Sequence, residues 1–261
     1  MGHIRQPAFA GSFYPADPLR LRALVQGCLG KARPGGAAPL AVIAPHAGYV
    51  YSGPVAGQAF ARLGLGRDRI RRVAVLGPSH RVAFRGLALS GAGGFATPLG
   101  TVPVDREGSD GLLDLPAVCL LEAAHELEHS LEVQLPFLQE VLGAFTLVPV
   151  VVGEAGPGEV AGVVERLWEE AGTAVVVSSD LSHYLTSAEA RKMDLATAEA
   201  IRRLDAAALG DEAACGCAPV RGLLVAARRR GLEAEVLDVR NSGDTAGGRD
   251  RVVGYGAFAF A

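Results

Sequence analysis

Short apolar runs alternate with longer amphipathic segments along almost the whole chain, and this alternation restricts the fold more than any other feature. The runs are rich in β-branched residues and have the length of strands. They read PLAVIAP, IRRVAVLGPSH, RGLALS, FTLVPVVVG, TAVVVSSDLSHY, LEAEVLDVRNSG and RVVGYGAFAF. Such alternation is typical of α/β proteins. We therefore predict one domain over residues 1–261, with a central mixed or largely parallel sheet flanked by helices.

The segments between these runs predict helices. DPLRLRALVQGCLGKA has Asp17 as N-cap and a stop near Gly30. SGPVAGQAFARLG begins with Ser52 as a potential N-cap. SDGLLDL predicts a short helix, and HSLEVQLPFLQEVLG predicts a longer one that Pro136 kinks. Three more helices are expected in GEVAGVVERLWEEAG, SAEARKMDLATAEAIRRL and CGCAPVRGLLVAARRRG, and a hairpin in FATPLGTVPVD.

Composition and charge exclude several classes of protein. Hydrophobic residues make up 49% of the 261 residues, and the net charge is −3. That charge favours neither a nucleic acid nor an anionic membrane as partner. We find no apolar run long enough for a membrane span and no signal peptide, so we expect a cytoplasmic protein. Four cysteines in this length are not a disulfide scaffold. Cys28 and Cys119 have apolar neighbours and are expected in the core.

Two histidines directly follow strand patterns. His46 ends PLAVIAP and His80 ends IRRVAVLGPS. In α/β proteins ligands bind at the carboxyl ends of strands, so the two imidazoles are expected in one pocket. Two histidines and one anionic ligand leave coordination positions open, which suits non-haem Fe(II) or catalytic Zn(II). The third ligand stays open among Cys215, Asp180, Glu132 and a further histidine. A helix N-terminus next to the cysteine would lower its thiol pKa.

Two other histidine motifs have competing interpretations. SSDLSHY places Asp180 three residues before His183, which suits an acid/base pair in which the aspartate orients the histidine. The alternative is a turn-capping aspartate and an exposed histidine. AHELEHSLE contains a literal H-E-x-x-H through His125 and His129. The α/β pattern is wrong for a zinc protease of that type, so we expect helix to begin near His129 and His125 to lie on the surface.

Seven blocks resemble one known family in this order. They are RQPAFAGSFYP, APHAGYVYSG, GPSH, EHSLEVQLPFL, SSDLSHY, CGCAPVRGLL and NSGDTAGGRDRVVGYGAFAF. They resemble the Memo family, whose prokaryotic members are called AmmeMemoRadiSam system protein B, and the match covers essentially the whole chain. That family's fold resembles the class III extradiol ring-cleaving dioxygenases. The resemblance therefore implies a LigB-like dioxygenase fold in a single α/β domain.

The resemblance also implies a metal site. Its metal-binding histidines correspond to His46 and His80, and its cysteine ligand corresponds to Cys215. Cys217 corresponds to none of the site residues that the resemblance implies. The ring-cleaving enzymes hold Fe(II) with two histidines and a carboxylate, whereas a thiolate here is softer and admits other metals. Fe(II) is the expected cofactor, with zinc or copper as alternatives.

Three further residues complete the site that the resemblance implies. Asp180 and His183 match polar residues beside the metal, and His129 is expected to line the same pocket. We predict catalytic roles for these three, with a small molecule or a peptide as ligand.

Three functions remain open. The first is an iron-dependent redox enzyme in which His183 moves protons. The second is a non-catalytic adaptor for a peptide or an anion, since SGDTAGG and helix N-termini such as that at Ser52 offer backbone N–H donors. Eukaryotic Memo proteins are associated with signalling and phosphotyrosine peptides, and the prokaryotic name implies a radical-SAM protein as partner. The third is a zinc hydrolase with His183 or Glu132 as base.

Overall fold

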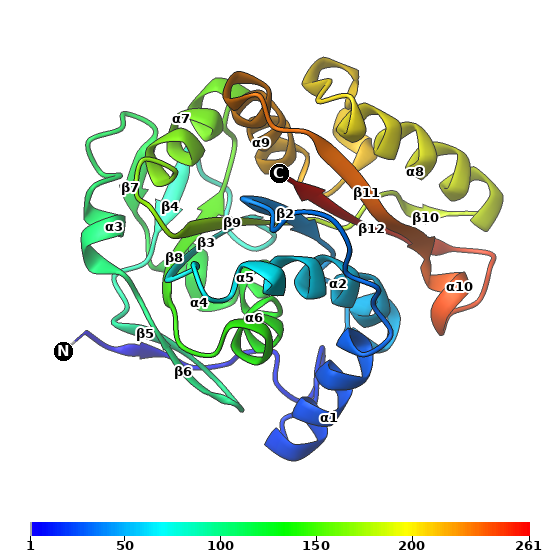
Figure 1. Cartoon of the computed structure of the whole chain (residues 1–261), viewed down its shortest axis with the longest axis horizontal. Helices are drawn as coiled ribbons and strands as arrows, with labels where there is room; N and C mark the ends of the chain where they lie inside the picture. Colours follow the sequence, from blue (N-terminus) through cyan, green and yellow to red (C-terminus); the bar gives the residue numbers. More distant parts are fainter. Residues whose placement is uncertain (1) are drawn as a thin grey trace.

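A mixed β-sheet runs through the middle of the molecule, and helices cover both of its faces (Figure 1). The computed structural model describes residues 2–261. The strand order is β10-β12-β2-β9-β3-β8-β4-β7, and β11 pairs with β12. The strands are β2 Ala41–Ala44, β3 Arg72–Pro78, β4 Leu87–Leu89, β7 Val118–Leu120, β8 Thr146–Val152, β9 Thr173–Ser178, β10 His183–Leu185, β11 Ala234–Asn241 and β12 Val252–Phe260.

The four central strands are parallel. β2 pairs with β9, β9 with β3, and β3 with β8, all in the same direction. β12 and β4 add antiparallel neighbours on either side. The central strands are buried on both faces, which explains their nearly continuous apolar sequences. Because they are parallel, the segments that follow β2, β3 and β9 leave the sheet at one edge. The α/β prediction is confirmed, and the sheet is mixed.

Alternate residues of each strand face two separate cores. Val42 and Ala44 of β2 pack into one, and Ala41 and Ile43 pack into the other. The helices that cover the first face include α1 Pro18–Leu29, α2 Tyr49–Leu63, α4 Ala123–Glu126, α5 His129–Glu132 and α6 Leu135–Leu142. Those on the second face include α7 Pro157–Leu167, α8 Ser187–Arg202 and α9 Cys217–Arg230.

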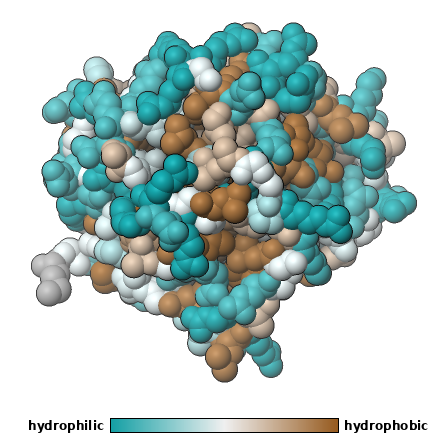
Figure 2. Space-filling view, in the orientation of Figure 1, coloured by the Kyte–Doolittle hydropathy of each residue, from teal (hydrophilic) through white to brown (hydrophobic). Residues whose placement is uncertain are grey.

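Smaller elements complete the chain. β5 Gly94–Thr97 and β6 Gly100–Pro103 form the predicted hairpin, and β1 Ile4–Arg5 adds to it in parallel. The short helix α10 Ser242–Thr245 lies in the predicted Gly-rich loop before β12. No helix in residues 2–261 is long and apolar enough to cross a membrane. On the face shown in Figure 2, apolar side chains reach the surface near the middle and are surrounded by hydrophilic ones.

The helix after β2 begins earlier than predicted. Its N-cap is Gly48 rather than Ser52, and the backbone N–H of Tyr49 donates to the carbonyl of Phe13. Ser52 is a buried helical residue whose hydroxyl donates to the carbonyl of Ala47. The N-terminal segment therefore supplies a partner for the first helical N–H, a contact that local sequence does not reveal.

Two other helix predictions need correction. HSLEVQLPFLQEVLG forms two helices, α5 and α6, because Pro136 occupies the first turn of a new helix, where its missing N–H costs little. The helix expected in SDGLLDL lies mostly before it, in α3 Arg106–Asp110, because Asp105 accepts from the N–H of Gly108 and acts as N-cap. The α1 prediction, with Asp17 and Gly30 as caps, is confirmed.

Of the two cysteines predicted to lie in the core, one is buried there. Cys28 is buried between α1 and α2, as expected. Cys119 is exposed, so its assignment to the core was wrong. It lies on β7, the last strand on one side of the sheet, where a neighbouring strand is present on one side only.

Candidate metal centre

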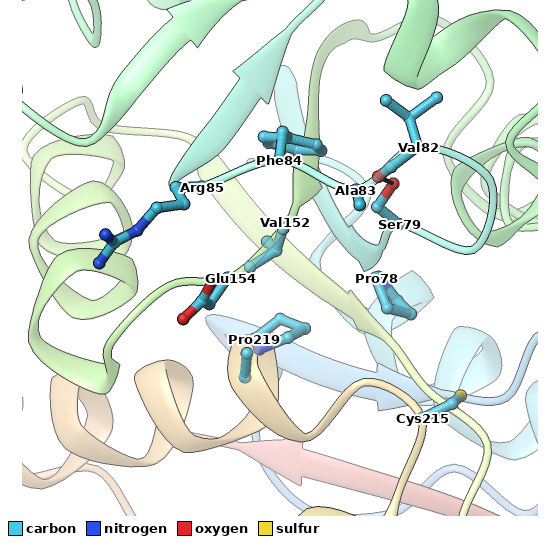
Figure 3. Close-up of a pocket in the computed structure, with 12 residues that line it drawn as sticks. Pro78, Ser79, Val82, Ala83, Phe84, Arg85, Val152, Glu154, Cys215 and Pro219 are labelled. Carbon is cyan, nitrogen blue, oxygen red and sulfur yellow. Dashed lines mark hydrogen bonds between the residues drawn. The ribbon is translucent and has the colours of Figure 1, made fainter.

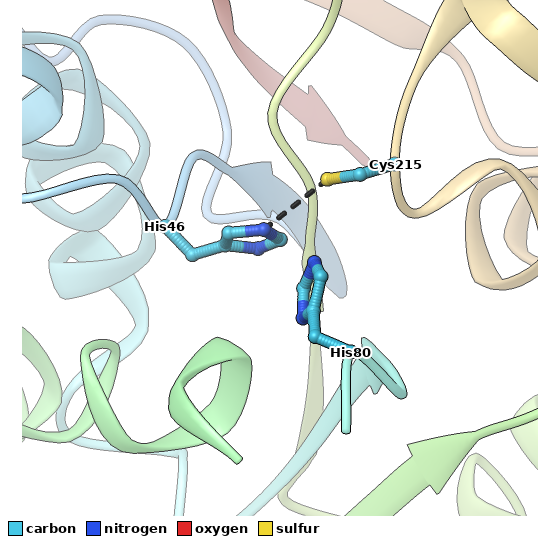
Figure 4. Close-up of side chains that lie close together, drawn as sticks. All are labelled: His46, His80 and Cys215. Atoms are coloured by element: carbon cyan, nitrogen blue, oxygen red, sulfur yellow. Dashed lines mark hydrogen bonds between the residues drawn. The ribbon is translucent and has the colours of Figure 1, made fainter. Parts of the chain in front are cut away.

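His46, His80 and Cys215 meet at the carboxyl edge of the parallel strands (Figure 4). The rings of the two histidines lie 5.1 Å apart at 84°. The Sγ of Cys215 lies 3.2 Å from Nε2 of His46. One ligand atom from each of the three residues lies within 4.8 Å of the other two. This spacing allows one ion to contact all three.

Ser178, the last residue of β9, fixes the tautomer of His46. Its hydroxyl donates to the carbonyl of Ser130 at 2.6 Å and accepts from Nε2 of Gln134 at 2.7 Å. Nδ1 of His46 lies 2.9 Å from the same hydroxyl. Because the hydroxyl has a single hydrogen, which Ser130 receives, Nδ1 must carry its own proton and donate. Nε2 therefore keeps its lone pair and faces the sulfur of Cys215.

Glu128 fixes the tautomer of His80 in a similar way. Its carboxylate accepts from Nδ1 of His80 at 2.9 Å and from the backbone N–H of His80 at 2.6 Å. Burial by itself raises the pKa of Glu128, but the hydrogen bonds that its carboxylate accepts from His80 and Ser130 help to hold the pKa below its usual range. The carboxylate is therefore ionised and orients the ring. Such a partner leaves Nε2 available to a metal and makes it more basic.

The thiol of Cys215 does not have the lowered pKa that its position near a helix suggested. Burial, followed by the negative charge of Asp180, raises its pKa to about 12. Loss of hydration outweighs the helix N-terminus because Cys215 lies two residues before α9. A cation at this point favours the thiolate, since a bound metal deprotonates a coordinating thiol. Two imidazole lone pairs and one thiol fit a transition-metal ion.

His129 lies beside the two metal-site histidines. Its ring centroid is 4.4 Å from that of His80 and 5.2 Å from that of His46. Phe9 and Phe13 pack against its ring at 5.3 Å and 4.8 Å. Burial lowers the pKa of His129 to about 3, so the ring is neutral. The ring lines the site together with the two phenylalanines, and its Nδ1 lies 3.3 Å from Oε1 of Glu128. His80, Glu128 and His129 form a second group whose ligand atoms lie within 4.8 Å of one another.

Asp180 does not orient His183. Its Oδ1 accepts from the backbone N–H of His46 at 2.8 Å and of Ala47 at 3.3 Å. Within residues 2–261 no hydrogen bond links it to the imidazole of His183, which begins β10. Burial raises the pKa of Asp180 to about 6. Through its two hydrogen bonds the aspartate holds the turn after β2 in place.

A pocket of about 590 Å³, which we call the large pocket, opens next to the histidines. His46, His80, His129, Asp180 and His183 all contribute to its wall. The structure thus brings five of the six predicted site residues, all but Cys215, to one pocket. Residues that the sequence did not indicate complete the wall, namely Phe13, Tyr51, Tyr184, Arg251 and Tyr255. Ser242, Gly247 and Gly248 place the SGDTAGG loop at the same pocket.

Glu132 is excluded as a metal ligand or a base. Its side chain is fully buried, and its carboxylate accepts from Arg5 Nη1 at 2.6 Å and the hydroxyl of Tyr14 at 2.5 Å. The backbone N–H groups of Ala8 and Phe9 donate to it as well. With these four partners, the carboxylate binds the N-terminal segment to α5.

His125 was expected on the surface, and this was wrong. It is buried in α4, and its Nε2 lies 2.9 Å from the carbonyl of Ala88. His129 belongs to the separate helix α5, so the two histidines do not form a zinc-protease motif. Cys217 is also buried, and its Sγ lies 3.2 Å from the carbonyl of Gly210. Neither His125 nor Cys217 lines the large pocket.

Two orienting residues were missed. Glu128 stands directly before His129, and a carboxylate next to a site histidine is a recognisable signal. Ser178 begins the SSD triplet at the end of β9. Its position, two residues before Asp180, is the one indication of its role.

Known proteins share this chain's sequence over nearly its full length. The family model described as Memo-like protein matches residues 5–259. A MEMO1 family protein of Methanopyrus kandleri is 36% identical, covering 98% of each chain. One of Aquifex aeolicus is 36% identical over 97% of each chain. One of Methanococcoides burtonii is 38% identical, over 97% of this chain and 98% of its own. The chain belongs to the Memo family.

Proposed function

We propose that this protein is a metal-dependent oxidoreductase that holds Fe(II) through His46, His80 and Cys215. One observation carries the proposal. Two imidazole nitrogens with available lone pairs and one sulfur converge beside an open pocket of about 590 Å³. Three protein ligands leave coordination positions for a substrate, the arrangement of catalytic rather than structural metal sites.

The surrounding residues prepare the site for that ion. Bound iron would supply electron transfer and coordination positions for small ligands. Ser178 and Glu128 hold the two imidazoles with Nε2 facing inward. Phe13 and the ring of His129 exclude water from one side. His183 is the proton carrier of the proposal, because it lines the pocket and no carboxylate within residues 2–261 forms a hydrogen bond with its imidazole.

Metal analysis of anaerobically purified protein tests the site. We expect about one iron per wild-type chain. His46→Ala and Cys215→Ala should each lose it, since two remaining ligands bind weakly. Cys217→Ala is the matched control, because this thiol lies two residues away and contacts the carbonyl of Gly210 instead. Equal metal content in wild type and Cys215→Ala, after anaerobic reconstitution, would contradict the proposed ligand set. If the wild type contains iron, the next experiment is to screen candidate substrates for oxygen uptake.

Binding of an anionic ligand is the second candidate, and three residues that line the pocket favour it. Arg251, Gly247 and Gly248 line the same pocket as Asp180. A guanidinium next to a Gly-rich loop suits a phosphate or carboxylate group. The adaptor form of this proposal has a phosphorylated peptide or a radical-SAM partner as ligand. Calorimetry with a phosphotyrosine peptide checks it, and Arg251→Gln should weaken binding more than His46→Ala.

A zinc hydrolase is the remaining alternative, with fewer residues available as its base. Glu132 is occupied by four donors and is unavailable as a base. His183 is then the residue left for that role. Stoichiometric zinc in protein purified without added metal, together with hydrolysis of model esters, would favour this function over the oxidoreductase.

A further inference from the structure

Cys215 lines two further pockets, and neither contains the site histidines His46 and His80. One, which we call the apolar pocket, has a volume of about 480 Å³ and is shown in Figure 3. Its wall is largely apolar, with Val82, Phe84 and Pro219, and the charged residues Arg85 and Glu154 lie away from the sulfur. The other has a volume of about 340 Å³ and a very different lining. We call it the acidic pocket.

The acidic pocket is lined by several groups that can bind a metal ion. Its lining includes His183, Leu185, Met193, Asp211, Glu212 and Cys215. The two carboxylate residues are exposed, and the side chain of Asp211 is 89% accessible. Met193 and His183 are half-buried. The lining therefore combines hard, hydrated oxygens at the surface with softer nitrogen and sulfur donors that are less exposed, including that of the ligand Cys215.

The large, apolar and acidic pockets differ in the charged residues that line them. The large pocket carries Arg251 and Asp180 in its wall, and the apolar pocket likewise carries one residue of each sign, Arg85 and Glu154. The acidic pocket carries two carboxylates, of which Asp211 is paired with Arg221 at 2.7 Å. No salt bridge of Glu212 is found within residues 2–261. Because a cleft lined by one sign of charge raises the local concentration of the opposite ion, this pocket is the one that attracts a cation.

We propose that the acidic pocket is the route by which the metal ion reaches the His46–His80–Cys215 site, with His183 and Met193 as transfer ligands. The inference rests on the proposed metal site. His183 lines both the acidic pocket and the large pocket, so it stands between the route and the histidines.

The same groups are too dispersed to retain an ion. Among residues 2–261, two groups of His, Cys, Asp or Glu bring three ligand atoms within 4.8 Å of one another. Both include His80, and neither includes Asp211 or Glu212. A pocket whose donors are spread along its length exchanges an ion between them, whereas the compact set at its end binds the ion. The lining therefore governs the rate of loading and has little effect on final occupancy.

Stopped-flow uptake of Co²⁺ by the metal-free full chain tests the route. Thiolate-to-cobalt absorption reports arrival at Cys215, without any activity assay. We expect Asp211→Asn/Glu212→Gln to lower the second-order rate constant about tenfold at low salt, at an unchanged final absorbance. The difference should shrink at about 0.5 M salt, because exposed charges are then screened. Met193→Leu, which keeps the volume, should slow uptake severalfold.

Matched variants of the apolar pocket serve as controls. Glu154→Gln removes a carboxylate there, and Ala83→Trp fills that pocket as Leu185→Trp fills the acidic one. The proposal expects slow uptake with Leu185→Trp and wild-type rates with both controls. Wild-type rates in the Asp211/Glu212 variant, or equal slowing by Glu154→Gln, would overturn the route. Failure of wild type to develop the thiolate absorption would instead contradict the metal site itself.

Discussion

Glu128 and Ser178 determine which nitrogen of each site histidine faces the metal position. Glu128 accepts from Nδ1 of His80, and Ser178 is within hydrogen-bond distance of Nδ1 of His46. Both groups are buried, so water does not compete for these bonds. The two imidazoles are therefore oriented before any ion binds. This preorganisation is typical of metal sites in which the groups behind the ligands tune affinity.

Glu128→Gln should weaken metal binding about 10- to 100-fold, because an amide has one acceptor oxygen where the carboxylate has two and no longer favours the proton on Nδ1 of His80. Competition with a chromophoric chelator measures the affinity. Glu126→Gln is the control, since Glu126 is exposed on the preceding helix. Unchanged affinity in Glu128→Gln would show that His80 does not need this partner.

The buried His125 predicts a loss of stability in acid. Burial lowers its pKa from about 6.5 to about 4. The unfolded chain therefore takes up a proton near pH 6.5, whereas the folded chain does so only near pH 4. Stability due to the neutral ring is complete above pH 6.5 and is lost as the pH falls towards 4, by roughly 3 kcal/mol in total.

Urea unfolding between pH 4 and pH 7.5 checks this expectation. His125→Gln retains a donor for the carbonyl of Ala88 but does not titrate. Its free energy of unfolding should fall less steeply with acidification than that of wild type. Parallel pH profiles for the two proteins would mean that His125 is already protonated, or solvated, in the folded state.

At the level of elements, the junction between β9 and α9 places the sulfur. Gly216 lies against the end of β9, and its N–H donates to the hydroxyl of Ser179 at 2.9 Å. A Cβ at Gly216 would lie 2.7 Å from the Cβ of Ser179 and 2.8 Å from the carbonyl oxygen of Ser178. The close approach of two backbones therefore requires glycine here, and it sets the position of Cys215.

Gly216→Ala should push the Cys215 turn away from β9. We expect a loss of about 1–3 kcal/mol in stability, as for other overpacked sites, together with weaker metal binding. Gly210→Ala is the control, because a Cβ there meets nothing within 4 Å. Thermal unfolding and Co²⁺ titration of both variants give the two readouts. A Gly216→Ala protein with wild-type affinity for Co²⁺ would mean that this packing does not place the thiol.

At the scale of the whole molecule, the N-terminal segment closes one side of the site. Arg5 and the N–H groups of Ala8 and Phe9 bind the carboxylate of Glu132 on α5. Arg5 also donates to the carbonyl of Glu128, whose side chain holds His80. The N-terminal segment is thus joined to α5, which lies in the long segment between β4 and β8.

Glu132→Ala should destabilise the protein by about 3–5 kcal/mol, because it leaves the guanidinium of Arg5 buried without its partner. Glu126→Ala, at an exposed position, should have little effect. Urea unfolding measures both. Limited proteolysis should also cut the Glu132→Ala variant near Phe9 and Phe13. A resistant N-terminus with near wild-type stability would contradict this account of the network.

The local sequence of this chain determined its helices and strands and the edge of the sheet at which the site histidines lie. Alternating apolar runs identified β2, β3, β8 and β9, and caps such as Asp17 identified helix starts. Placement of His46 and His80 followed from these elements, because parallel strands end at one edge of a sheet. The approach of Cys215, in contrast, was expected from the resemblance to the Memo family.

Only the tertiary structure decided what each polar side chain contacts. Glu132 was a candidate ligand until Arg5 and Tyr14 were seen to occupy it, more than a hundred positions away in sequence. His125 was assigned to the surface, yet the strand carrying Ala88 covers it. The thiol pKa of Cys215 rises because packing removes its water. Patterns of neighbouring residues encode propensity and periodicity, whereas burial and hydrogen-bond partners depend on segments brought together only by folding.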